Sequence, residues 1–136
     1  MNSKKSKNLF ECKMESENEE QVCERLGIDN KTLRQYIGNH RVYAIKVMHD
    51  ENRRKRKFLF PVFQFDGSQI IPRLSTALKY VSKDTHPAAI NKFFLMPTDE
   101  LKSRKVNGPI SPRDWLIAGG AVVDVIRMIQ ELAESP

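Results

Sequence analysis

Apolar side chains recur every three or four positions between residues 17 and 38, over two short segments in succession. That spacing predicts two helices, each with one buried face. Gly27 lies between them at a position suited to end a helix, and Asp29 or Asn30 is suited to cap the second one. Two short helices joined by so tight a turn indicate a helix-turn-helix. The apolar stripes consist of Val22, Cys23, Leu26, Leu33, Tyr36 and Ile37.

The pattern then changes to that of β-strands. Residues 42–47, VYAIKV, alternate and are rich in β-formers, so they predict a strand. Residues 48–55 are polar and predict a loop, and residues 56–60 predict a second strand that is ended by Pro61. A hairpin with a long basic loop directly after a helix-turn-helix is typical of a wing.

Helical spacing returns in the second half of the chain. The segment PVFQFDG, from Pro61 to Gly67, predicts an extended apolar link that ends in a turn. Proline or serine at the expected helix starts, and proline or glycine at the expected ends, favour a series of short helices. These predicted helices cover about residues 72–81, 87–96, 112–118 and 121–132.

The predicted organisation has three parts in a chain of 136 residues, a length that suits one domain or two very small ones. Residues 1–16 are polar with little periodicity and predict a flexible arm. Residues 17–66 form the helix-turn-helix with its hairpin wing, and residues 67–136 form a compact helical bundle. The expected fold class is therefore mainly α with a small β-hairpin.

Positive charge is concentrated in the first of these two folded parts. The net charge is +6. Residues 21–60 carry ten Lys or Arg and four acids, a net charge of +6, whereas residues 1–20 sum to −1 and residues 61–136 to +1. Charge localised on one module is expected of a protein that binds a polyanion.

Candidate DNA-binding residues follow from what the apolar stripes leave outside the core. Polar side chains on the second helix would hydrogen-bond base edges, and cations of the wing would neutralise phosphates. The predicted base-reading residues are Lys31, Thr32, Arg34 and Gln35, and the predicted phosphate-binding residues are Arg41, Arg53, Arg54, Lys55, Arg56 and Lys57. We therefore expect a sequence-specific regulator that binds double-stranded DNA. An adaptor that binds an acidic partner or RNA through the basic loop is the alternative.

Other function classes find little support in the residues. No nucleophile–base pair or Gly-rich phosphate loop occurs, so we expect neither an enzyme nor a cofactor. Cys12 and Cys23 form no disulfide framework, and the scattered histidines provide no zinc site. No apolar run approaches the roughly 20 residues that span a bilayer, and the N-terminus lacks a secretory signal, so we expect a cytoplasmic protein.

Three motifs of the second half carry a resemblance to a known family. They are FPVFQFDGSQIIPRL from Phe60, NKFFLMPTDEL from Asn91 and GPISPRDWLIAGGAVVDVIRMI from Gly108. In order and spacing they resemble the toxin-binding domain of the Xre/MbcA/ParS antitoxin group, over about residues 58–133. The first half looks more like a winged helix-turn-helix of the MerR or excisionase type than like the longer Xre bundle.

The resemblance implies that the C-terminal half contacts a RES-domain toxin and assembles oligomers, while the N-terminal half binds the operator of its own operon. Symmetric dimers on palindromic sites are common, because pairing two small reading heads doubles their contacts. We therefore expect a homodimer built on residues 112–133. The predicted interface residues are Trp115, Leu116, Val122, Val125, Ile126 and Ile129.

Overall fold

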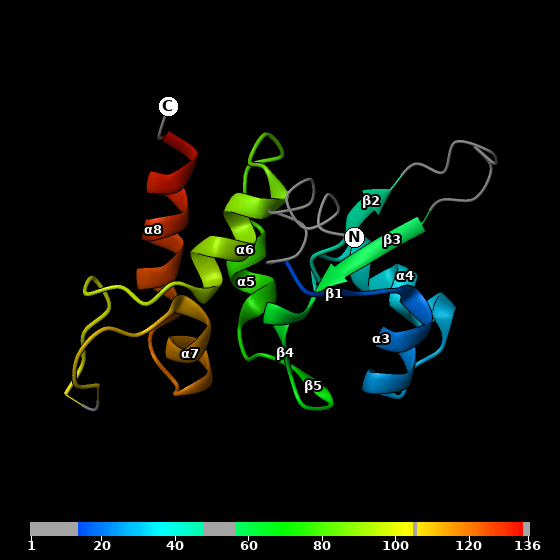
Figure 1. The fold of residues 1–136 in the computed structure, drawn as a ribbon, viewed down its shortest axis with the longest axis horizontal. Helices are drawn as coiled ribbons and strands as arrows, with labels where there is room; N and C mark the ends of the chain where they lie inside the picture. The colour runs from blue at the N-terminus through cyan, green and yellow to red at the C-terminus, as the bar shows by residue number, and fades with distance from the viewer. Residues whose placement is uncertain (1–13, 48–56, 105, 135–136) are drawn as a thin grey trace, which may run out of the picture.

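A computed structural model describes residues 14–47, 57–104 and 106–134 (Figure 1). Within them lie six α-helices, one 3₁₀ turn and two small antiparallel sheets, so this part is mixed α/β, with more sheet than the single predicted hairpin. The elements are β1 (Ser16–Glu17), α3 (Glu19–Leu26), α4 (Asn30–Gly38), β2 (Ile45–Val47), β3 (Lys57–Pro61), η1 (Val62–Gln64), β4 (Phe65–Asp66), β5 (Gln69–Ile70), α5 (Leu74–Leu78), α6 (Pro87–Leu95), α7 (Pro112–Ile117) and α8 (Val122–Glu134).

Local sequence signals fix the α3–α4 pair. Asn18 and Gln21 exchange hydrogen bonds in a capping box at the start of α3. Gly27 ends the helix with φ 68°, a left-handed conformation that glycine adopts without strain, and Asp29 caps α4, so both predictions are confirmed. The predicted first helix, however, includes Glu17, which instead belongs to β1.

The first half also contains a three-stranded sheet in the order β1-β3-β2, with β1 before the two helices and β2 and β3 after them. Ile45 pairs with Leu59 in the predicted hairpin, and Ser16 pairs with Pro61 on the other edge of β3. The predicted arm therefore ends in a paired strand, which its polar composition does not indicate. The predicted loop at 48–55 lies outside the described residues.

The segment after Pro61 is not the extended link that its apolar character predicts. It makes a 3₁₀ turn at η1 and then the β4–β5 hairpin, whose turn includes Gly67 at φ 63°. The turn sends the side chain of Gln64 into the interior, where it is fully buried. This segment carries the chain from the sheet to the helical half.

Three of the four predicted helices of the second half match closely, and the first is shorter. Helix α5 begins only at Leu74, because Arg73 has φ 60° and interrupts the helix that the sequence predicts from Pro72. Helices α6 and α7 both have proline in the first turn, after the caps His86 and Ser111. In Figure 1 these helices lie on one side of the molecule and α3, α4 and the three-stranded sheet on the other, with β4–β5 between them.

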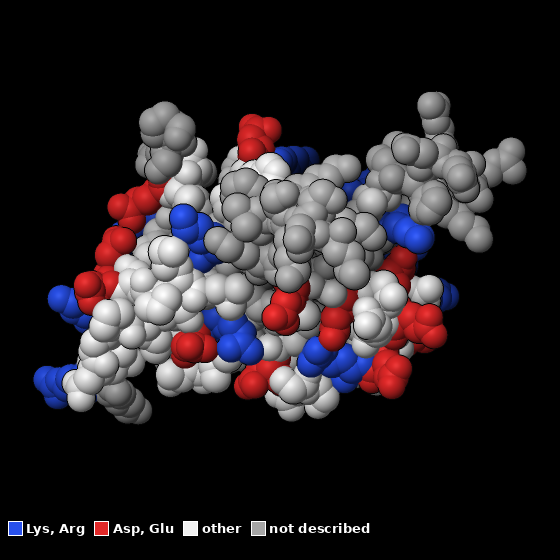
Figure 2. Space-filling model, in the orientation of Figure 1, with Lys and Arg blue, Asp and Glu red and all other residues white. Residues whose placement is uncertain are grey.

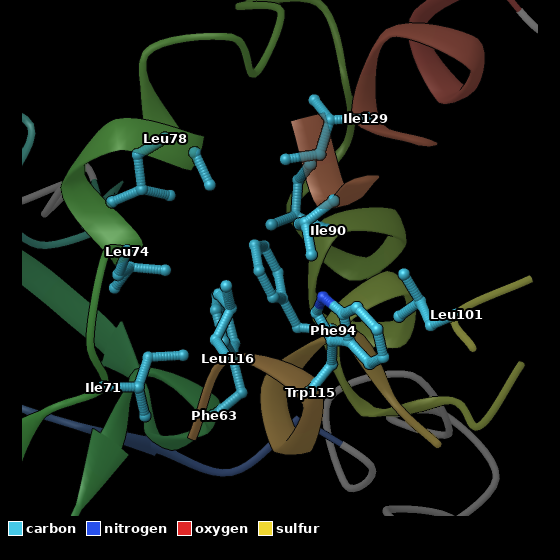
Figure 3. Packing of buried hydrophobic residues seen from close by; sticks show 12 residues of the cluster. Phe63, Ile71, Leu74, Leu78, Ile90, Phe94, Leu101, Trp115, Leu116 and Ile129 are labelled. Atoms are coloured by element: carbon cyan, nitrogen blue, oxygen red, sulfur yellow. The ribbon is translucent and has the colours of Figure 1, made fainter. Parts of the chain in front are cut away.

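Two clusters of buried apolar residues hold the structure together. The smaller one lies in the first half and contains Val22, Leu33, Val42, Phe60 and Phe65. The larger one lies among α5–α8 and is shown in Figure 3, where Phe63 and Phe94 stack with ring centroids 4.6 Å apart. Ile70 packs against both clusters, so the two halves are in contact at β4–β5.

The larger cluster corrects the predicted interface. Trp115, Leu116, Val125 and Ile129 are at most 3% exposed, and all four pack inside the chain itself. A buried side chain cannot anchor a second molecule without unfolding, so these four are core residues. Val122 and Ile126 are only half-buried.

Candidate nucleic-acid interface

Two of the four predicted base-reading residues are exposed to solvent on the outward face of α4. Lys31 and Gln35 are exposed, one turn apart, and Thr32 is half-buried. The Thr32 backbone N–H donates to the Asp29 carboxylate at 2.8 Å. Hydrogen bonds from Thr32 lower the pKa of the Asp29 carboxyl, so the cap is charged at neutral pH. The cap fixes the start of α4 and thereby the direction in which Lys31 and Gln35 project.

Arg34 is predicted to read bases, but its guanidinium is held by residues of two other elements. Its Nε and Nη2 donate to the two carboxylate oxygens of Glu19 at 2.9 and 3.1 Å. Its guanidinium also lies 4.9 Å from the ring centroid of Phe58. In this structure Arg34 therefore connects α4 to α3 and to β3, and it is not available to read bases.

The contact between Arg34 and Phe58 places the hairpin beside α4. Lys57, the residue before Phe58, is exposed and pairs with Val47 across the hairpin. The other predicted wing cations, Arg53, Arg54, Lys55 and Arg56, lie outside the described residues. Because Arg34 lies in the middle of α4 and Phe58 in β3, α4 and the part of the hairpin where Val47 pairs with Lys57 belong to one side of the molecule.

Arg41 follows α4 and is held close to it. Its guanidinium lies 4.3 Å from the ring centroid of Tyr36, and its backbone N–H donates to the Tyr36 carbonyl at 2.9 Å. The side chain is exposed, so the charge faces solvent. Stacking on an aromatic ring restricts an arginine while leaving its N–H donors free for an anion.

Helix α3 is acidic where α4 is basic. Glu20 and Glu24 are exposed on it, and Figure 2 shows acidic side chains over the α3 region. The exposed carboxylates of α3 disfavour a polyanion there, whereas the exposed cations Lys31, Arg41 and Lys57 favour one near α4 and β3. Sequence reasoning missed Glu19 as a partner of Arg34, because the two residues are 15 positions apart and only the fold brings them together.

Reactive chemistry is not evident in the described residues. Burial, together with the nearby carboxylates of Glu19 and Asp29, raises the pKa of the Cys23 thiol, which keeps it protonated and weakly nucleophilic. The described residues contain no cluster of three or more His, Cys, Asp or Glu that could hold a metal ion. None of the described helices is long and apolar enough to cross a membrane.

The helical half presents a few large apolar side chains to solvent, at positions other than the predicted ones. Leu95 and Met96 at the end of α6 are 44% and 52% exposed, and Val123 on α8 is 64% exposed. Trp115, by contrast, is fixed from within, because its Nε1 donates to the Ala121 carbonyl at 2.9 Å. Tyr80, after α5, is 47% exposed, so the exposed large apolar side chains of this half lie at three separate places.

Comparison with known proteins shows a likeness of fold alone. No protein-family model matches the chain, and no curated protein matches it. The chain is similar to a solved structure described as the NMR structure of Rv2175c, with a TM-score of 0.59 and 19% sequence identity. That similarity covers 89% of this chain and 82% of the other.

Proposed function

We propose that the chain binds double-stranded DNA through a winged helix-turn-helix formed by α3, α4 and the β2–β3 hairpin. The observation that supports the proposal is the packing of Arg34 on Phe58, because it brings α4 and β3 of the hairpin to one side of the molecule. The concentration of positive charge in residues 21–60 supports it.

In this mode α4 lies in the major groove. Gln35 is able to pair with adenine in a bidentate manner, and Lys31 is able to donate to guanine acceptors or to a phosphate. Arg41 and Lys57 bind the backbone on either side, and the basic loop extends the phosphate contacts. Asp29 orients the helix and does not itself contact the DNA.

The test is fluorescence anisotropy with labelled duplex DNA from the region upstream of the protein's own operon. Lys31→Ala/Gln35→Ala should weaken specific binding by about 1–3 kcal/mol for each side chain that pairs with a base. Arg41→Gln/Lys57→Gln should weaken binding to all sequences alike and reduce the slope of log K against log salt by about 1.8.

A matched control is available in the helical half. Lys79→Ala/Gln130→Ala removes the same types of side chain from exposed positions on the far half. Equal losses of affinity in the control and in the Lys31/Gln35 variant would reject the assignment of α4 as the recognition helix. Unchanged affinity in all of these variants would reject DNA binding by this surface.

We further propose that the DNA-binding chain acts as the antitoxin of a RES-type toxin, and that the helical half binds the toxin and a second copy of the chain. The resemblance of the three motifs of the second half to the Xre/MbcA/ParS group supports this part. Co-expression with a neighbouring RES-type reading frame should give a complex that copurifies, and Leu95→Ser/Met96→Ser should weaken it. Copurification unaffected by these substitutions would exclude the end of α6 as the binding surface.

A further inference from the structure

A cleft of about 420 Å³ opens between the first half and the helical half. One wall comes from the end of α4 and from β2, and the other comes from the end of α5 and the segment that leads into α6. Its apolar lining includes Ile37, Val42, Ala44 and Ile45 on the first side, with the ring of Tyr43, and Leu78, Val81 and Pro87 on the second. This volume falls in the range of about 300–1,000 Å³ that is usual for small-molecule sites.

The charged residues that line the cleft are both cationic. They are Lys46 on β2 and Lys83 before α6, and no carboxylate residue belongs to the lining. Neither ammonium group has an ion-pair partner among the described residues. Both lysines are exposed to solvent, and a cation on each wall gives the cleft a positive potential that attracts an anionic ligand.

Hydroxyl groups and the N-terminus of a helix at the cleft also favour a negatively charged ligand. Ser82 and Thr85 contribute hydroxyl groups to the lining, and Pro87 places the N-terminus of the nine-residue helix α6 at the cleft. Pro87 has no N–H and the Ala88 N–H already donates to His86 Nδ1 at 3.0 Å, so this helix end contributes its partial positive charge but no free donor. The cleft therefore combines an apolar body with a positively charged rim.

We propose that this cleft binds a small aromatic monocarboxylate. The ring lies against the apolar lining, and the carboxylate pairs with Lys46 and Lys83. A nucleic acid strand is too bulky and too highly charged for a cleft of this size, whereas an uncharged apolar ligand would leave the two ammonium groups unpaired. The proposal is independent of DNA binding.

The test is an NMR titration of the ¹⁵N-labelled full-length chain with 2-naphthoate, in the absence of DNA. Saturable shifts should concentrate in residues 37–46 and 78–87. The uncharged analogue 2-naphthalenemethanol should bind about tenfold more weakly, because it forms neither ion pair. No saturable shifts, shifts centred elsewhere, or equal affinity for the two compounds would overturn the proposal.

Substitution of the two lysines tests whether their charges bind the carboxylate. Lys46→Gln/Lys83→Gln should weaken 2-naphthoate binding about tenfold, while Lys92→Gln/Lys102→Gln, with the same charge change at exposed positions outside the cleft, should not. Equal effects of these two double variants would show that only net charge matters and would overturn the proposal.

Filling the cleft gives a second and independent readout. Thr85→Trp should abolish binding, and Thr76→Trp, on an exposed position of α5, should leave it intact. Binding that survives in a folded Thr85→Trp protein, judged by its dispersed NMR spectrum, would contradict the site. If Thr85→Trp does not fold, the lysine variants decide the question.

Discussion

The guanidinium of Arg34 lies between two groups from different elements, the Glu19 carboxylate of α3 and the Phe58 ring of β3. The Arg34 side chain is 46% exposed, so water screens the ion pair, and its net contribution to stability is of the order of 0–1 kcal/mol. A DNA phosphate could therefore replace Glu19 as the partner of Arg34 at small cost. If the chain binds DNA as proposed, Glu19 competes with a phosphate for this arginine.

Glu19→Gln should increase affinity for duplex DNA about three- to tenfold at low salt, because it frees Arg34 for one more phosphate contact. The slope of log K against log salt should steepen by about 0.9 in anisotropy titrations. Glu24→Gln is the matched control, since it removes the same charge from an exposed position on α3. Equal increases in affinity in both variants would mean that only net charge changed, and that Arg34 is not released.

The structural role of Gln64 cannot be predicted from its place in the sequence. Its side-chain oxygen accepts from the Tyr43 backbone N–H, and its Nε2 donates to the carbonyls of Tyr43 and Pro61. In the sequence it is one polar residue among phenylalanines, in a segment that predicts an extended apolar link. The 3₁₀ turn buries the Gln64 side chain, and its amide group then hydrogen-bonds the Tyr43 backbone as a neighbouring strand would.

At the level of elements, the corner between α7 and α8 is built around one close approach. A Cβ added to Gly120 would lie 2.3 Å from a ring carbon of Trp115, so the backbone passes directly over the indole. Arg73 also donates to the carbonyls of Leu116 and Gly120 at this corner. The corner therefore depends on glycine at position 120 for space.

Gly120→Ala should lower the free energy of unfolding by about 1–3 kcal/mol, because the methyl group must displace the Trp115 ring or the backbone. Gly38→Ala is the control: it lies in α4 with nothing within 4 Å of the added Cβ, and it should be neutral or stabilising by up to about 1 kcal/mol. Urea denaturation measures both. A Gly120→Ala protein as stable as Gly38→Ala would show that the corner is looser than described.

Elements with strong local signals are predictable from the sequence, and those defined by distant partners are not. Gly27, Asp29 and Ser111 mark helix ends through their own backbone preferences and side chains. Strand β1 has only two residues and exists through pairing with β3, some 45 positions later, so local alternation cannot reveal it. Helix α7 has six residues, too few for periodicity to show that Trp115 faces inward.

On the scale of the whole molecule, Arg113 links the helical half to the segment between the two core clusters. Its Nε donates to the Phe63 carbonyl and its Nη2 to the Phe65 carbonyl, both at 2.7 Å. Phe63 belongs to the larger cluster and Phe65 to the smaller one, so a single guanidinium bridges residues of both. This link helps to position the first half of the chain relative to the helices of the second.

Arg113→Lys should destabilise the chain by about 1.5–3 kcal/mol, because lysine cannot donate to both carbonyls in the same geometry. Arg127→Lys, at an exposed ion pair on α8, should cost less than about 1 kcal/mol. The two free energies come from urea denaturation followed by the fluorescence of Trp115, the chain's one tryptophan, and by circular dichroism. Equal costs for the two substitutions would contradict the bridging role.

The most direct test of DNA binding is an NMR map of the ¹⁵N-labelled chain titrated with duplex operator DNA. The proposal predicts that backbone shifts concentrate in α4, at Arg41 and at the base of the β2–β3 hairpin, and that they diminish as salt is raised. Residues of α5–α8 outside any dimer contact should change little. Shifts centred on α3 or on the helical half, or no shifts at low salt, would contradict it.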